Sequence, residues 1–156
     1  MSRFDACGIS MDVPTGWEVR ATLPQPTNGA GIEEPYLHAA SFALPSRRAP
    51  YGGGVVEVMG PSDMFVALVE FAPSSAGTAL FASAGVPRRL RGADYSPATL
   101  QRALRGQSGI QRFFHVEGRA FSLFVVAGGT SAIQRGITDV NTLLSSVRVR
   151  AREVSS

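Results

Sequence analysis

Residues 110–149 constrain the fold of this chain more than any other segment. Two apolar runs, residues 110–116 and 120–127, lie on either side of a Glu-Gly-Arg sequence at residues 117–119. Two strand-like runs separated by a short glycine-containing sequence are typical of a β-hairpin. The sequence therefore predicts a pair of adjacent antiparallel strands with residues 117–119 as their turn.

A helix is predicted directly after this hairpin. Gly128 and Gly129 end the second strand, and Ser131 and Gln134 have the spacing of a capping box, which predicts that a helix starts here. Apolar side chains then recur at helical spacing, which indicates that one face of the helix packs against a sheet. These residues are Ile133, Ile137, Val140, Leu144 and Val147. A short final strand is expected over residues 147–150.

The rest of the chain predicts further strands and two short helices. Residues 64–71 are apolar except for Glu70, as expected for a central strand covered on both faces. Shorter strands are expected at residues 8–13, 17–19, 37–44 and 55–59. Short helices are expected from Ser74 or Ser75 to Ala84 and from a Ser96 cap to Gly106. Short turns between successive strands favour an α+β fold, with an antiparallel sheet flanked by helices.

Length and composition fit one domain over residues 1–150 and a polar tail over residues 151–156. No apolar run is long enough to cross a bilayer, so no membrane association is expected. The first residues lack a signal-peptide pattern, and Cys7 is a lone cysteine that cannot form an internal disulfide. These features favour a cytoplasmic location for the protein. All 15 basic residues are arginines, which excludes chemistry that needs a lysine amine.

Two segments together resemble the PsbP-like superfamily. Phe4 followed by Gly-Ile-Ser-Met-Asp-Val-Pro-Thr-Gly-Trp at residues 8–17 is similar to its opening strand and Pro-x-Gly-Trp turn. Residues 118–126 and the Asn-Thr-Leu-Leu-Ser-Ser-Val-Arg-Val sequence at residues 141–149 are similar to its terminal hairpin, helix and edge strand. The resemblance implies an α/β/α sandwich around an antiparallel sheet. It also implies a non-catalytic accessory or adaptor protein that binds a larger partner.

Positive charge is concentrated in one part of the chain, residues 88–112, called here the basic segment. Residues 86–112 hold six arginines and one acid, a balance of +5, whereas residues 1–85 hold four arginines and eight acids, a balance of −4. The candidate binding residues are Arg88, Arg89, Arg91, Arg102, Arg105 and Arg112. Arginine binds oxyanions through its planar fork, and Arg102 and Arg105 would share one face of the helix expected after Ser96. A solvated surface, or pairing with the acidic first half, is the alternative interpretation.

Other candidate sites have simple structural alternatives. His115 and Glu117 would lie on one face of a strand, where they could act as an acid/base pair. A surface pair is the simpler interpretation, and the same holds for His38. The loop at residues 45–54 is either a recognition loop or a connector. Gly128-Gly129 before the helix could attract an anion, although termination of a strand explains it equally well.

The sequence therefore favours a non-enzymatic binding or adaptor domain that acts through protein–protein contacts. No catalytic residue, metal site or cofactor is expected. A homo- or hetero-oligomeric subunit is one alternative, because oppositely charged parts of the chain can associate. A hydrolase that uses His115 and Glu117 is the other. A protein partner or self-association is expected, and nucleic acid is a less favoured partner because the net charge is only +3.

Overall fold

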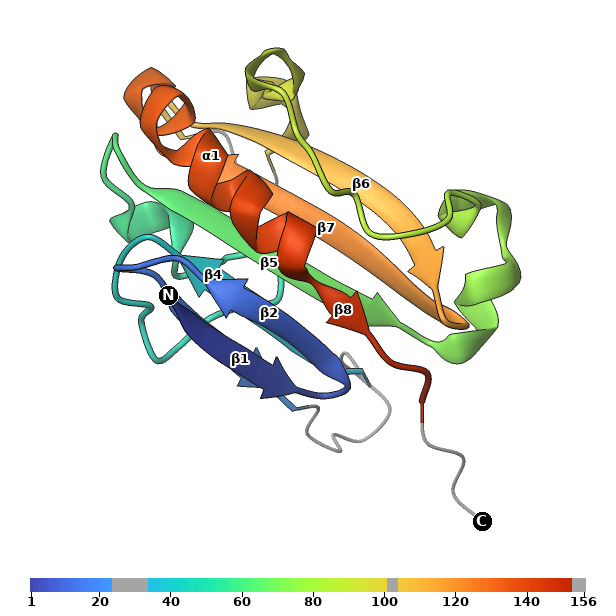
Figure 1. Ribbon diagram of the computed structural model, residues 1–156. Coiled ribbons are helices and arrows are strands. Elements are labelled where there is room, and N and C mark those ends of the chain that lie inside the picture. The colour runs from blue at the N-terminus through green and yellow to red at the C-terminus, as the bar shows by residue number, and fades with distance from the viewer. Residues whose placement is uncertain (24–33, 101–103, 153–156) are drawn as a thin grey trace.

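The computed structural model describes residues 1–23, 34–100 and 104–152. Two antiparallel sheets and one α-helix form the framework of this part of the chain (Figure 1). In chain order the elements are β1 (Ser2–Ala6), β2 (Ile9–Val13), β3 (Glu18–Thr22), β4 (Tyr36–Ala40), η1 (Val56–Val58), β5 (Met64–Phe71), η2 (Pro73–Gly77), η3 (Ala79–Phe81), η4 (Gly92–Asp94), η5 (Pro97–Thr99), β6 (Ser108–Val116), β7 (Arg119–Ala127), α1 (Thr130–Ser146) and β8 (Arg148–Val149), where η marks a short 3-10 helix.

The larger sheet has five strands in the order β3-β4-β5-β7-β6, and every neighbouring pair is antiparallel. The expected central strand is confirmed, because β5 lies between β4 and β7 and its residues from Met64 to Glu70 are all buried. The expected hairpin is confirmed as β6 and β7. Its turn contains only Glu117 and Gly118, both at positive φ, and Arg119 already pairs with Val116 as the first residue of β7. Two residues at positive φ give a turn whose twist matches that of the flanking strands.

The smaller sheet has three strands in the order β1-β2-β8. The sequence did not predict β1, which pairs with β2 through a turn at Cys7 and Gly8. The expected terminal strand is confirmed in part, because β8 pairs with β2 over two residues and not with the larger sheet. The first and last strands of the described residues therefore lie in the same small sheet.

The helix α1 carries the apolar face that the sequence predicted. Its buried residues are Ala132, Val140, Leu143 and Leu144. Ile133 and Ile137 are only half-buried, so the buried stripe is rotated slightly from the predicted one. The predicted capping box is wrong. Gly129 occupies the N-cap without a side-chain hydrogen bond, and the Ser131 hydroxyl donates to Pro61 O instead.

Gly128 and Gly129, directly before α1, lie where the backbone of residues 60–61 packs closely against them. A Cβ atom on Gly128 would lie only 1.9 Å from Gly60 O. A Cβ atom on Gly129 would lie 2.8 Å from Pro61 O. Both contacts are too short for any side chain. These glycines therefore allow residues 60–61 to pack directly against the start of α1.

The two faces of the larger sheet are covered differently. Figure 1 shows α1 and the small sheet on one side of β5 and β7. On that side, Leu68 and Leu123 from the sheet belong to one buried core with Met11 of β2 and Leu143 of α1. On the opposite face, irregular residues 41–59 provide the cover. Leu44 and Val55 of that segment pack with Phe65 and Phe124 of the sheet.

Three predicted elements are therefore wrong in type. The strand expected at residues 55–59 is the 3-10 helix η1, and the helix expected from Ser74 or Ser75 to Ala84 consists of η2 and η3. The Ser96 cap is confirmed, since its hydroxyl accepts a hydrogen bond from Ala98 N, but only the turn η5 follows it. Residues 101–103 of that predicted helix lie outside the described residues. The fold is α+β with antiparallel sheets, and in the described residues one α-helix covers one face.

Candidate functional site

The structure divides the six candidate arginines between three places. Arg88, Arg89 and Arg91 lie in the segment that crosses from the edge of β6 toward α1, and all three are exposed. Arg112 lies on β6 and forms an ion pair with Asp94 at 3.8 Å. Arg105 is exposed in a turn before β6. The helix face expected for Arg105 and Arg102 is not formed, because Arg105 lies in this turn and Arg102 is outside the described residues.

A buried leucine fixes the crossing segment to α1. Leu90 is 3% exposed. Its backbone N–H donates to Asn141 Oδ1 at 2.8 Å, and Asn141 Nδ2 donates to Leu90 O at 3.1 Å. This paired hydrogen bond imitates strand pairing and holds the backbone in one position. Arg89 and Arg91, on either side of Leu90, therefore project from a fixed backbone.

Arg88 and Arg148 converge on the C-terminal end of α1. Arg88 Nη1 donates to Leu144 O at 3.0 Å, to Ser145 O at 3.2 Å and to Val147 O at 2.5 Å. Arg148 Nη1 donates to Ser145 O at 3.1 Å and to Val147 O at 3.0 Å. Cations are favourable here because the last carbonyls of a helix carry partial negative charge. Partial burial, together with the positive charge of Arg148, lowers the pKa of Arg88 below its ordinary value.

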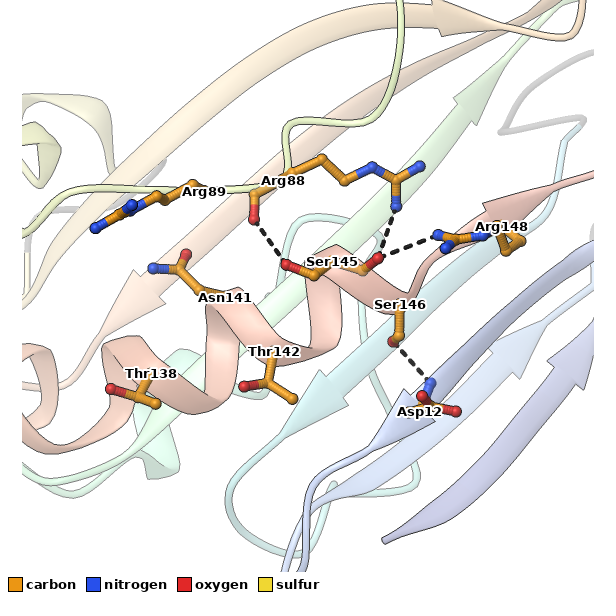
Figure 2. A pocket seen from close by; sticks show the side chains of 9 residues that line it. All are labelled: Asp12, Arg88, Arg89, Thr138, Asn141, Thr142, Ser145, Ser146 and Arg148. Atoms are coloured by element: carbon orange, nitrogen blue, oxygen red, sulfur yellow. Dashed lines mark hydrogen bonds between the residues drawn. The ribbon is translucent and has the colours of Figure 1, made fainter.

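These arginines border a polar groove of about 620 Å³, called here the helix-end groove (Figure 2). Its lining residues are Asp12, Arg88, Arg89, Thr138, Asn141, Thr142, Ser145, Ser146 and Arg148. Figure 2 shows the guanidinium of Arg88 pointing toward Arg148, whereas that of Arg89 points the opposite way along α1. Asp12, the single acid of the lining, is paired with Arg3 at 3.1 Å. The sequence analysis missed Arg148 as a member of this site.

His38 is part of a buried network under the loop at residues 45–54. Its side chain is fully buried, and Nε2 lies 2.8 Å from Pro50 O. Because a carbonyl only accepts, Nε2 carries the hydrogen, and Nδ1 accepts from Arg48 Nε at 3.0 Å. Arg48 also donates to Pro45 O at 2.8 Å and to Thr22 Oγ1 at 3.3 Å. His38 therefore fixes the loop to the sheet.

His115 and Glu117 are not neighbours on a strand face. His115 Nδ1 lies 2.6 Å from Phe81 O. Glu117 is exposed in the hairpin turn at positive φ, outside β6. Sequence spacing of two residues places side chains on one face only when both residues are extended. The expectation that His115 and Glu117 share one face of a strand is therefore wrong.

A buried ion pair connects the neighbouring strands β5 and β7 of the larger sheet, and its arginine also reaches the backbone beside the smaller sheet. Arg119 Nη2 lies 2.7 Å from Glu70 Oε1, and the two side chains are 4% and 1% exposed. Arg119 also donates to Cys7 O and to Arg150 O, each at 2.9 Å. The sequence analysis did not identify this pair, although Glu70 was the single charge in an apolar strand. The lone cysteine, Cys7, lies in the turn between β1 and β2, next to this ion pair. It is half-buried, and burial raises the pKa of its thiol.

Beside the basic segment, the hydroxyl of Tyr95 is buried without a hydrogen-bond partner among the described residues. Burial raises the pKa of Tyr95, and the nearby charge of Asp94 adds to the effect. An unsatisfied buried hydroxyl costs about 1–3 kcal/mol. We expect Tyr95→Phe to raise the free energy of unfolding in urea by about 1 kcal/mol.

Tyr36→Phe is the matched control, because the Tyr36 hydroxyl donates to Arg48 O at 3.4 Å. That variant should leave the free energy of unfolding unchanged or lower it. If Tyr95→Phe lowered it as well, the Tyr95 hydroxyl would have a partner after all.

Comparison of the chain with protein-family models, with curated proteins and with solved structures finds no match. Over residues 1–23, 34–100 and 104–152, no helix combines the length and apolarity needed to span a membrane. In the same residues no three His, Cys, Asp or Glu side chains gather closely enough to hold a metal ion.

Proposed function

We propose that this protein is a non-enzymatic binding or adaptor domain that acts through protein–protein contacts at its basic segment. One observation carries the proposal. Leu90 is buried and doubly hydrogen-bonded to Asn141, while Arg89 and Arg91 beside it are exposed. Exposed arginines on a fixed backbone are suited to an acidic partner surface because little backbone freedom is lost on binding. The resemblance to the PsbP-like superfamily supports the same kind of role.

An acidic protein surface fits this segment better than nucleic acid does. Single-stranded nucleic acid requires exposed aromatic rings on which bases stack. Phe114, however, is 1% exposed and stacks on Phe121, and Phe113 packs edge-on against Phe81. Phe113 and Phe114 are therefore engaged in packing within the protein and do not stand free for bases to stack on.

The position of His38 supports a structural role for this residue over a catalytic one. His38 is enclosed by Arg48 and Pro50, and His115 contacts a backbone oxygen. A general base must reach the substrate proton directly or through one water. His38, fully buried, has both ring nitrogens in contact with the protein.

The test is affinity capture from native extract with quantitative mass spectrometry, using the parent protein and Arg89→Glu/Arg91→Glu. We expect the parent to retain a stoichiometric protein partner and the double variant to retain at least tenfold less of it. Capture should also weaken as salt is added, because exposed charges are screened.

Arg135→Glu is the control, since Arg135 is an exposed arginine of α1 outside the basic segment. It should capture the partner as the parent does. Equal capture by all three proteins, each shown to be folded, would overturn the proposed surface.

A further inference from the structure

Two guanidinium groups share the same carbonyl oxygens at the C-terminal end of α1. Arg88 Nη1 and Arg148 Nη1 both donate to Ser145 O and to Val147 O. The Nε and Nη2 groups of both arginines make no hydrogen bond to another described residue, so each guanidinium keeps one edge for a further acceptor.

In the described residues no carboxylate balances the positive charge of this pair, which faces only the partial charges of the helix-end carbonyls. Among the described residues, neither Arg88 nor Arg148 forms an ion pair with a carboxylate. The nearest acid of the lining, Asp12, is held by Arg3, and its backbone N–H donates to Ser146 Oγ at 2.8 Å. The pKa of Arg88 is lowered partly by the charge of Arg148, as expected for like charges brought together.

We propose that the helix-end groove is a phosphate-binding site, in which one phosphate group lies between the free edges of Arg88 and Arg148. A phosphate group carries about −1.5 to −2 charges at pH 7 and three strong acceptor oxygens. It therefore neutralises both arginines, whereas a carboxylate neutralises one. Guanidinium groups bind such oxyanions through two parallel hydrogen bonds.

The remainder of the groove indicates what is attached to this phosphate. From the arginine pair the groove continues along α1 past Thr142, Asn141 and Thr138, and Arg89 points along this direction (Figure 2). A polar wall of this kind fits a peptide segment. We take the source of the phosphate to be a phosphorylated side chain of the protein partner. This part of the proposal rests on the proposed function.

The experiment is a titration of 15N-labelled protein at low salt, followed through backbone amide and arginine Nε signals. The ligands are inorganic phosphate, a short phosphoserine peptide, and the same peptide with aspartate in place of phosphoserine. We expect saturable shifts confined to Arg88, Arg148 and the end of α1 with both phosphate ligands. The aspartate peptide should bind at least tenfold more weakly.

Arg148→Gln is the informative variant, because Arg148 is exposed and Arg88 continues to cap the helix. It should weaken phosphate binding at least tenfold. Arg135→Gln removes an equal charge from α1, at a residue that does not line the groove, and should leave binding unchanged. Shifts that are the same in parent and Arg148→Gln, or equal binding of the aspartate peptide, would overturn the site.

The two phosphate ligands distinguish the source. Tighter binding of the phosphopeptide supports a phosphorylated partner, and equal binding supports free phosphate held by the same arginines. If this site binds phosphate but Arg89→Glu/Arg91→Glu still captures the partner, only the proposed function fails. If the titration fails but capture depends on Arg89 and Arg91, only the phosphate site fails.

Discussion

Replacing Arg119 by Met should lower the free energy of unfolding by about 3–5 kcal/mol. Arg119 donates to both carboxylate oxygens of Glu70, at 2.9 and 2.7 Å, and both side chains are almost fully buried. Without the guanidinium, Glu70 keeps only Arg152, whose side chain is 37% exposed, and the carbonyls of Cys7 and Arg150 lose a donor. The substitution leaves a buried carboxylate with one partly exposed partner and removes two further hydrogen bonds, so a large loss of stability is expected.

The measurement is equilibrium unfolding in urea, with Arg3→Met as the matched control. Arg3 and Asp12 form an exposed pair, with side chains 60% and 44% exposed, so its loss should change stability by less than about 1 kcal/mol. The double variant Glu70→Leu/Arg119→Met should recover part of the loss, because it removes the buried charge. A change below about 1 kcal/mol in Arg119→Met would show that water or another residue compensates Glu70.

Local patterns were sufficient to predict the elements whose signals lie within a short stretch of sequence. The hairpin of β6 and β7 has its turn residues between two apolar runs, and β5 is apolar throughout except for Glu70. The strand predicted at residues 55–59 fails because apolarity alone does not distinguish a strand from a turn. There, backbone hydrogen bonds from Val58 N to Val55 O and from Met59 N to Val56 O close the chain into η1. Glu57 Oε2 also accepts from Gly54 N at 2.8 Å.

The candidate site could be predicted only in part, because tertiary structure assembles it. Arg88 and Arg89 were found from charge density alone. Arg148 lies sixty positions from Arg88 in the sequence. The two meet because the pairing of Leu90 with Asn141 holds the segment of Arg88 against α1, whose end Arg148 follows. Glu70 did carry a usable signal, since a charge in a strand buried on both faces requires a partner.

Acidification from pH 6.5 to pH 4 should remove about 3 kcal/mol of stability through His38. Burial, partly opposed by the hydrogen bond to Pro50 and reinforced by the charge of Arg48, lowers the pKa of His38 from 6.5 to about 4. The unfolded chain therefore binds a proton at His38 that the folded chain does not bind in this range. The stabilisation is complete above pH 6.5 and is lost progressively as the pH falls toward 4.

Protonation also has a direct structural cost. A hydrogen on Nδ1 of His38 would face the Nε–H of Arg48, which now donates to that atom at 3.0 Å. The loop at residues 45–54 is fixed through this pair and through Pro50 O. As the pH falls, the loop that covers Phe65 should therefore loosen first. The opposite face of the sheet, against which α1 packs, should loosen later.

Urea unfolding between pH 4 and pH 7 measures the effect in the parent protein and in His38→Leu. The variant should be less stable at pH 7, because Arg48 Nε and Pro50 O lose their partner. The comparison uses how the difference between the two proteins changes with pH, not its size at one pH. The carboxylates titrate alike in both proteins, so the difference between the two curves isolates His38. That difference should shrink by about 3 kcal/mol on going from pH 7 to pH 4. A constant difference would mean that His38 binds its proton equally well in the folded and unfolded chain, and the buried network would then not hold it neutral.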